Sequence, residues 1–118
     1  IERGANDLDG ALCLAASWGR QTIVLLLIER GANGLNLALY LAAEEGHLEL
    51  VILLIERGAN NLNEALHHAA GKKQRETVLL LIEHGADDLD WALLGARYHN
   101  RAGIISLLEE KIATLEKK

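Results

Sequence analysis

The chain has 118 residues, half of them hydrophobic and a quarter charged, which predicts one folded domain and excludes a disordered chain. It has no Pro, Phe or Met and only 3% aromatic residues, so Leu, Ile, Val and Ala must build the core, and a large β-sandwich or barrel is disfavoured. The net charge of −5 argues against a nucleic-acid or anionic-membrane partner, and the single cysteine, Cys13, excludes an internal disulfide and a cysteine-only zinc site.

The start of the chain carries no targeting signal that the sequence reveals. No apolar run reaches the roughly 18 residues that a membrane-spanning helix needs, and no signal-like stretch opens the chain. We therefore expect a soluble intracellular protein, in the cytoplasm or the nucleus. The first residue is Ile1 rather than Met, which favours a processed, trimmed or partial chain.

Four copies of one short string divide the chain into units. IERGAN starts at Ile1, Ile28 and Ile55, and a close copy, IEHGAD, starts at Ile82, so each copy begins 27 residues after the one before it. A fixed period of this size is typical of a solenoid, in which each unit stacks on its neighbours. We expect one repeat domain over 1–118, with units at 4–30, 31–57, 58–84 and 85–111. Residues 1–3 are then the remnant of a preceding unit, and 112–118 extend or cap the last helix.

Each unit is predicted to contain two helices joined by a tight turn. The N-caps of the first helices, whose side-chain oxygens can accept a free backbone N–H, are predicted at Asp9, Asn36, Asn63 and Asp90. The turn positions are Gly19, Gly46, Lys73 and Asn100. Gly and Asn tolerate the left-handed conformation that ends a helix, so Lys73 predicts strain or a different turn. The second helices carry an apolar block and should stop at Gly31, Gly58 and Gly85.

The segment 41–60, LAAEEGHLELVILLIERGAN, resembles the ankyrin repeat, whose pattern is LAA, two variable residues, GH, a Val-rich helix and GA[DN]. The usual ankyrin unit has 33 residues. The six residues missing here fall between GAN and the first helix, where ankyrin repeats place a β-hairpin. The TPLH motif is altered as well, and only His67 keeps its His. We therefore expect an all-α fold, an α-solenoid of four stacked helix-turn-helix ankyrin-like repeats with short loops.

The two ends of the stack are predicted to differ. In the fourth unit, Glu109 and Ser106 replace the Ile and Leu of the other units, and Ile112 replaces the Gly that ends the second helix. This pattern indicates a polar C-terminal cap, with the last helix running on through Leu115. The N-terminal end has no such cap, so the outer face of the first unit should be apolar.

The resemblance implies a scaffold that binds a protein partner through a groove of first-helix side chains, because the hairpin tips are missing. All four aromatic residues fall in the predicted first helices, in columns that vary between units, and Trp and Tyr are common binding hot spots. The alternative is that Trp18 and Tyr98 only cover gaps between helices. The predicted partner-binding residues are Trp18, Leu37, Tyr40, Glu44, Glu45, Glu64, His67, Lys72, Trp91, Tyr98 and His99.

A second candidate surface is the row Leu25, Ile52 and Leu79, where ankyrin repeats usually carry a polar residue. An exposed row would indicate a partner or self-association. Burial of the row between units is the interpretation that we favour. A trimmed or engineered stack with no dedicated ligand, self-associating through the N-terminal face or this row, is the alternative function.

The sequence predicts no enzyme, no cofactor and no metal site. Cys13 and His67 share a column two units apart, and packed helices lie about 8–10 Å apart, so the two residues should be roughly 20 Å apart. Cys13 is expected to be a small apolar filler. By the resemblance, His67 should hydrogen-bond the backbone of a neighbouring loop. A basic band over His67, His68 and residues 72–75 is interpreted as a solvated turn.

Overall fold

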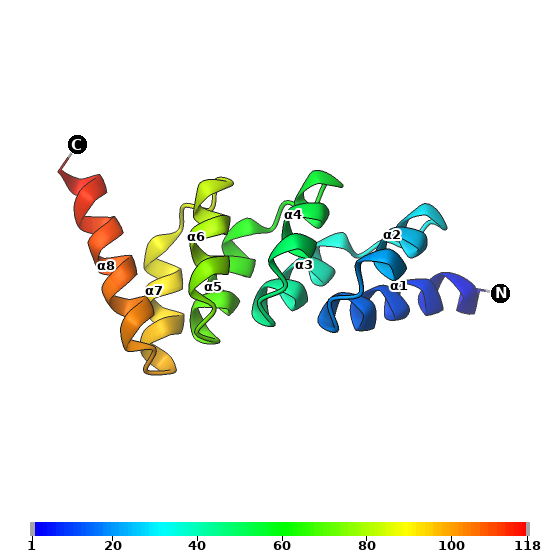
Figure 1. The fold of residues 1–118 in the computed structure, drawn as a ribbon, viewed down its shortest axis with the longest axis horizontal. Coiled ribbons are helices and arrows are strands. Elements are labelled where there is room, and N and C mark those ends of the chain that lie inside the picture. Colours follow the sequence, from blue (N-terminus) through cyan, green and yellow to red (C-terminus); the bar gives the residue numbers. More distant parts are fainter. Residues whose placement is uncertain (1, 118) are drawn as a thin grey trace.

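The computed structural model describes residues 2–117, with side chains from Leu8 onward, as a set of α-helices with no strand in that range (Figure 1). The helices are α1 (Glu2–Ser17), α2 (Gln21–Glu29), α3 (Leu35–Glu44), α4 (Leu48–Glu56), α5 (Leu62–Gly71), α6 (Arg75–Glu83), α7 (Leu89–Tyr98) and α8 (Ala102–Glu116). They form four helix pairs in chain order, which confirms the predicted all-α repeat stack.

The four pairs stack into an elongated molecule of 53 × 27 × 22 Å. Each first helix packs on the first helix of the next pair, so that α1, α3, α5 and α7 form one layer. The second helices form the other layer and lie farther apart from one another (Figure 1). The first helices therefore hold the stack together, and their side chains are the ones that neighbouring units bring into contact.

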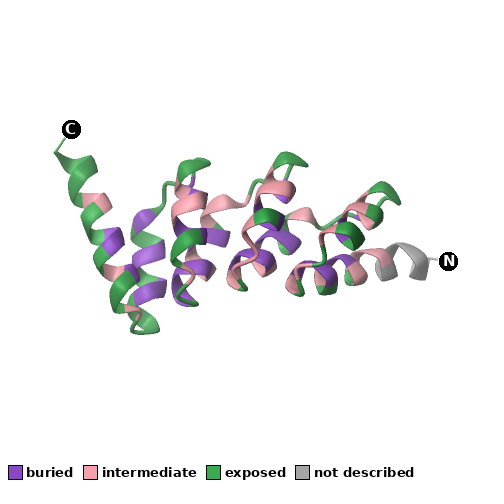
Figure 2. Ribbon diagram, viewed as in Figure 1, coloured by how far each residue is buried: buried purple, intermediate pink, exposed green. Residues whose placement is uncertain are grey.

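Small residues explain the close packing of the first helices. Ala38, Ala65 and Ala92 occupy one column and have no exposed surface. A second column of small residues, also fully buried, is Ala42, Ala69 and Ala96. Without bulky side chains at these positions the helix backbones can approach closely, and larger residues such as Leu39 and Leu66 fill the remaining space. Figure 2 shows the resulting buried band along α3, α5 and α7.

The turn inside each pair has the same geometry, including the third pair. Lys73 has φ 68°, close to 73° at Gly19 and 77° at Gly46. The backbone hydrogen bonds repeat as well, since the N–H of Lys73 donates to the carbonyl of Ala70 as that of Gly46 does to Ala43. The third unit thus keeps the common turn, and a lysine in the left-handed region costs about 1–2 kcal/mol. The predicted helix ends at Gly31, Gly58 and Gly85 are confirmed, with φ of 100–115°.

Three of the predicted N-caps are wrong by two residues, and the fourth, Asp9, lies well inside α1, which begins at Glu2. The observed N-cap residues are Gly34, Asn61 and Asp88, and of these only Asp88 accepts a hydrogen bond through its side chain, from the backbone N–H of Trp91 at 3.2 Å. The predicted column lies inside the helices and reaches the following unit instead. The side-chain oxygens of Asp9, Asn36 and Asn63 accept hydrogen bonds at 2.6–2.8 Å. The donors are the backbone N–H groups of Asn33, Asn60 and Asp87, respectively.

A second column also links neighbouring units. The residue before each of the last three second helices hydrogen-bonds a backbone carbonyl at the end of the first helix of the preceding unit. These residues are His47, Gln74 and Arg101. These carbonyls belong to Ser17, Glu44 and Gly71, at 2.8, 3.1 and 2.9 Å. The second and third junctions are therefore held at both ends of the first helix, by an Asn at one end and by this column at the other, whereas at the first junction Asp9 lies midway along α1.

The first pair departs from the predicted unit. Helix α1 already begins at Glu2, so the backbone of Glu2 and Arg3 is not the end of a preceding helix; Ile1 lies outside the described residues. Trp18 lies in the turn after α1 rather than in the first helix. The boundaries of the four units themselves stay a prediction.

The two ends of the stack differ as expected. At the C-terminal end, α8 continues to Glu116, and Arg97 forms an ion pair with Glu109 at 2.9 Å. Arg97 occupies the column of Ala16, Ala43 and Ala70, all fully buried. At the N-terminal end Leu14, Ile23 and Leu26 remain 45–56% exposed. The row Leu25, Ile52 and Leu79 is half-buried, so the neighbouring units bury it only in part.

Candidate partner-binding surface

Three consecutive first helices bring four rings into one series. Tyr40 comes from α3, His67 and His68 come from α5, and Trp91 comes from α7; we call these four residues the aromatic strip. The rings of Tyr40 and His68 stack with centroids 4.5 Å apart, and those of His67 and Trp91 stack at the same distance. His67 and His68 meet edge to face at 5.5 Å. The strip is thus an unbroken chain of ring contacts across three units.

The ring of His67 is fixed by the backbone of the next unit. Its Nδ1 lies 2.9 Å from the carbonyl oxygen of Trp91. Because a carbonyl can only accept, Nδ1 carries the proton and donates. The predicted partner of His67 was a neighbouring loop, and this is wrong, because Trp91 lies in the first turns of α7. A Cβ at Gly95 would come within 3.0 Å of the His67 ring, so the absence of a side chain there lets the ring lie against α7.

His68 faces a carboxylate as well as a ring. Its Nδ1 lies 3.9 Å from Oε2 of Glu44, one turn after Tyr40 on α3. The two side chains are 34% and 21% exposed, so the pair is partly shielded from water, and it becomes an ion pair when His68 is protonated. The predicted site residues Tyr40, Glu44, His67 and Trp91 therefore meet in one place, with His68 between them.

The remaining predicted residues surround the strip or lie away from it. Leu37 is 45% exposed in α3, and Glu64 in α5 accepts a hydrogen bond from Asn61 at 2.8 Å. Tyr98, the last residue of α7, is 84% exposed and contacts His99 edge to face. Trp18, 64% exposed, lines a separate apolar hollow at the N-terminal end. The helix-terminal residues are Glu45, Lys72 and His99, all exposed. The rings of Trp18 and Tyr98 are therefore largely open to solvent, and the choice between binding a partner and covering a gap stays a prediction for both.

Sequence reasoning missed two residues of this surface. His68 was interpreted as part of a basic turn, but it lies inside α5 and joins Tyr40 to His67. Leu94, one turn after Trp91 on α7, is 61% exposed. The column of His68 holds Leu14, Leu41 and Gly95, so it also varies between units, although less than the selected columns, in which no residue type repeats. That variation was the available signal.

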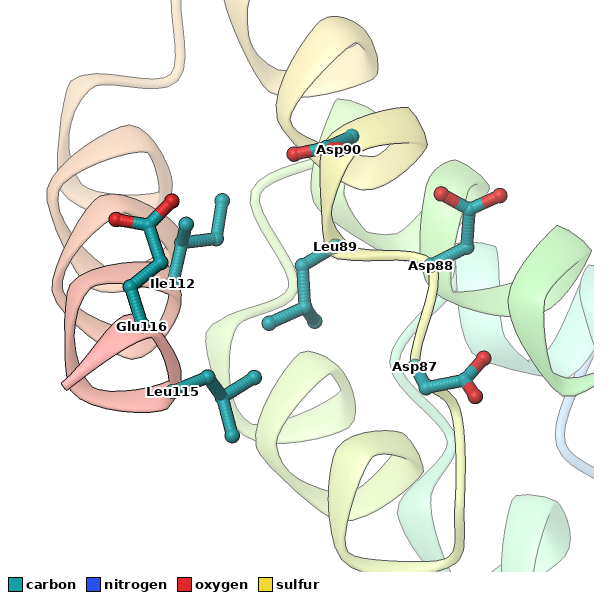
Figure 3. Close-up of a pocket in the computed structure, with 7 residues that line it drawn as sticks. All are labelled: Asp87, Asp88, Leu89, Asp90, Ile112, Leu115 and Glu116. Carbon is teal, nitrogen blue, oxygen red and sulfur yellow. The ribbon is translucent and has the colours of Figure 1, made fainter. Parts of the chain in front are cut away.

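A hollow with several acidic residues lies near the C-terminal end of the molecule. It has a volume of about 270 Å³ and lies between the end of α8 and the loop before α7, where Leu89 and Leu115 face one another (Figure 3). Two of its four acidic residues have internal partners. Asp87 accepts from the side chain of Asn63, and Asp88 accepts from the backbone of Trp91. These hydrogen bonds tie Asp87 and Asp88 to neighbouring elements of the fold.

Cys13 is a half-buried thiol with a raised pKa. Burial is the main cause, and the negative charge of Asp9 raises the pKa further. The thiol therefore stays protonated near neutral pH and lacks the thiolate that a catalytic nucleophile needs. Among the side chains that the structure describes, from Leu8 to Lys117, no group of three or more His, Cys, Asp or Glu is placed to hold a metal ion. No helix in the same range is long and apolar enough to cross a membrane.

Comparison with known families agrees with this architecture. A family model of ankyrin repeats in three copies matches residues 12–90, which is more than half of the chain. The chain therefore belongs to the ankyrin-repeat family. Members of this family are generally protein–protein interaction modules and typically non-enzymatic scaffolds. The comparison with curated proteins found no match.

Proposed function

We propose that this chain binds a protein partner through the aromatic strip and the first-helix side chains around it. The observation that carries the proposal is the continuous series of ring contacts from Tyr40 to Trp91. Rings held in place by their neighbours lose little side-chain entropy when a partner covers them, and aromatic residues dominate binding hot spots. The exposed Leu37 and Leu94, one turn from Tyr40 and Trp91, add apolar area beside the rings.

The test is affinity capture with the intact chain as bait and a variant with both Tyr40→Ala and Trp91→Ala. We expect captured partners to be lost with the double variant, because both outer rings of the strip are removed. Leu26→Ala is the matched control, since Leu26 is 46% exposed but lies on a second helix, and its variant should keep the partners. Unfolding of the double variant, measured by circular dichroism, would place the rings in the core and overturn the proposal. Retained capture would also overturn it.

Self-association is a second candidate, and one observation favours it. The first helix pair has an apolar hollow of about 260 Å³, lined by Ala11, Leu14, Ala15, Trp18, Arg20 and Ile23. The residues in the column of Ile23 are Leu50, Thr77 and Ile104, at most 2% exposed. A face that is buried inside the stack is therefore open at this end. A single monomeric species in sedimentation over a wide concentration range would exclude this candidate.

A further inference from the structure

The second-helix layer has an apolar hollow with an acidic edge between α4 and α6. Its volume is about 250 Å³, and it is lined by Leu48, Ile52, Leu79, Leu80, Glu76 and Glu83. The four aliphatic side chains are half-buried. Both carboxylates come from α6, are exposed, and make no ion pair or side-chain hydrogen bond with any described residue. None of these residues belongs to the aromatic strip, which lies on the first helices.

The preceding junction holds a polar bridge at the corresponding place. Between α2 and α4, Nε2 of Gln21 donates to Oε1 of Glu49 at 2.9 Å and bridges the two helices. The same columns at the next junction hold Leu48 and Glu76. A leucine cannot donate, so the bridge is absent there. The substitution leaves the carboxylate of Glu76 without a partner and places an aliphatic side chain at the edge of the hollow.

The two carboxylates set a spacing for whatever covers the hollow. Glu76 and Glu83 are seven residues apart on α6, which is about 10 Å along the helix axis and nearly two turns. The apolar residues Leu79 and Leu80 lie between them. A helix laid along α4 and α6 would match this arrangement if it carried two basic residues two turns apart, with an aliphatic residue midway.

We propose that the hollow between α4 and α6 docks an amphipathic helix of a partner protein, with a Leu-like side chain in the hollow and Lys or Arg facing Glu76 and Glu83. Charge complementarity argues for this occupant over a second copy of the chain, because a second copy would bring its own unpaired carboxylates to the contact. The docking surface is independent of the proposed function, since it uses the second helices and a different partner chemistry.

The probe is a fluorescein-labelled helical peptide with two lysines two turns apart and a pair of leucines between them, titrated with the intact chain by fluorescence anisotropy. We expect saturable binding that weakens as the salt concentration rises, because screening reduces the attraction between the lysines and the carboxylates. A peptide with glutamates in place of the lysines should not bind. Equal binding of the two peptides would overturn the proposal.

Two variants locate the site. Glu76→Lys together with Glu83→Lys should weaken binding by at least about tenfold, because both ion pairs become repulsive. Leu48→Gln places at the second junction the residue that bridges the first, so the bridge to Glu76 should form and binding should be lost while the fold is kept. Binding that survives either variant contradicts the proposal.

Two controls separate this surface from the other candidates. Tyr40→Ala with Trp91→Ala should bind the peptide normally, and loss of binding in that variant would move the site to the aromatic strip and overturn the proposal. The chain alone should sediment identically with and without Leu48→Gln. If the unmodified chain dimerises and Leu48→Gln makes it monomeric, the occupant is a second copy, and the amphipathic-helix proposal fails.

Discussion

At the scale of single residues, packing against neighbouring helices determines the backbone conformation or the side-chain size at several positions. It does so more strongly than the intrinsic conformational preference of the residue. Lys73 adopts a left-handed turn that glycine adopts elsewhere in the same column, because the helices on both sides fix the geometry. Gly95 lies in the middle of α7, where alanine would favour the helix. The glycine is explained by the neighbouring unit, since the His67 ring lies where a side chain would go.

Gly95→Ala tests whether packing against His67 outweighs the helix propensity of alanine. Helix propensity alone predicts a gain of about 1 kcal/mol in the free energy of unfolding. A Cβ there would lie 3.0 Å from the His67 ring and from the His67 backbone oxygen, which cannot move away. We therefore expect a net loss of about 1–3 kcal/mol, the usual cost of overpacking. Urea denaturation followed by circular dichroism measures it.

Gly10→Ala is the matched control for that prediction. Gly10 lies in α1 with no atom within 4 Å of the position of a Cβ, so the substitution should raise the unfolding free energy by up to about 1 kcal/mol. Equal effects of the two substitutions would mean that His67 does not constrain Gly95.

At the scale of helices, the pattern of the sequence predicted the pairs, the turns and the stopping glycines, because these depend on residues near one another in the chain. It failed where a side chain acts across units. Asn36 and Asn63 were predicted to cap their own helices, yet each accepts the backbone N–H of a residue 24 positions later. A column of Asn and Asp reveals that an acceptor is needed but not where the donor lies. For the same reason the sequence pattern predicted Tyr40 and Trp91 as partner-binding residues but not His68, which lies between them.

Asn63→Ala tests the link between units. Its side-chain oxygen accepts from the backbone N–H groups of Asp87 and Asp88, at 2.8 and 2.9 Å. Both residues are exposed, so water can replace the lost acceptor, and we expect a loss of only about 1 kcal/mol in unfolding free energy. Amide hydrogen exchange of Asp87 and Asp88 should quicken at the same time.

Asp90→Ala is the control, because Asp90 occupies the same column and its side chain makes no hydrogen bond with a described residue. Its effect should stay within about 0.5 kcal/mol, as is usual for an exposed substitution. A cost equal to that of Asn63→Ala would show that the column acts within its own helix, as first predicted from the sequence.

At the scale of the whole molecule, the stack has one apolar end and one polar end. Arg97 and Glu109 replace the Ala and Ile of the other units and pair with each other across the last two helices. The opposite end leaves Ile23 and Leu26 nearly half exposed. We therefore expect the polar end to oppose stacking by the apolar end of another copy.

The double variant Arg97→Ala with Glu109→Ile restores the residues of the internal units at the polar end. We expect head-to-tail association in sedimentation experiments, stronger at higher concentration and beyond that of the unmodified chain, because a contact between unlike ends does not close on itself. Adding Ile23→Glu should reverse it by placing a charge on the opposite end. If the double variant sediments like the unmodified chain, the end of α8 blocks stacking by itself.

The side-chain hydrogen bonds between units join residues 24 to 30 positions apart, so each links a unit only to its neighbour. In a molecule linked in this way, tension between the two ends is transmitted through each junction in turn. A pull on its two ends loads every junction equally, and the weakest one opens first while the others keep their shape. A partner that binds several units at once would bridge the junctions between them and raise the force needed to open any one of them.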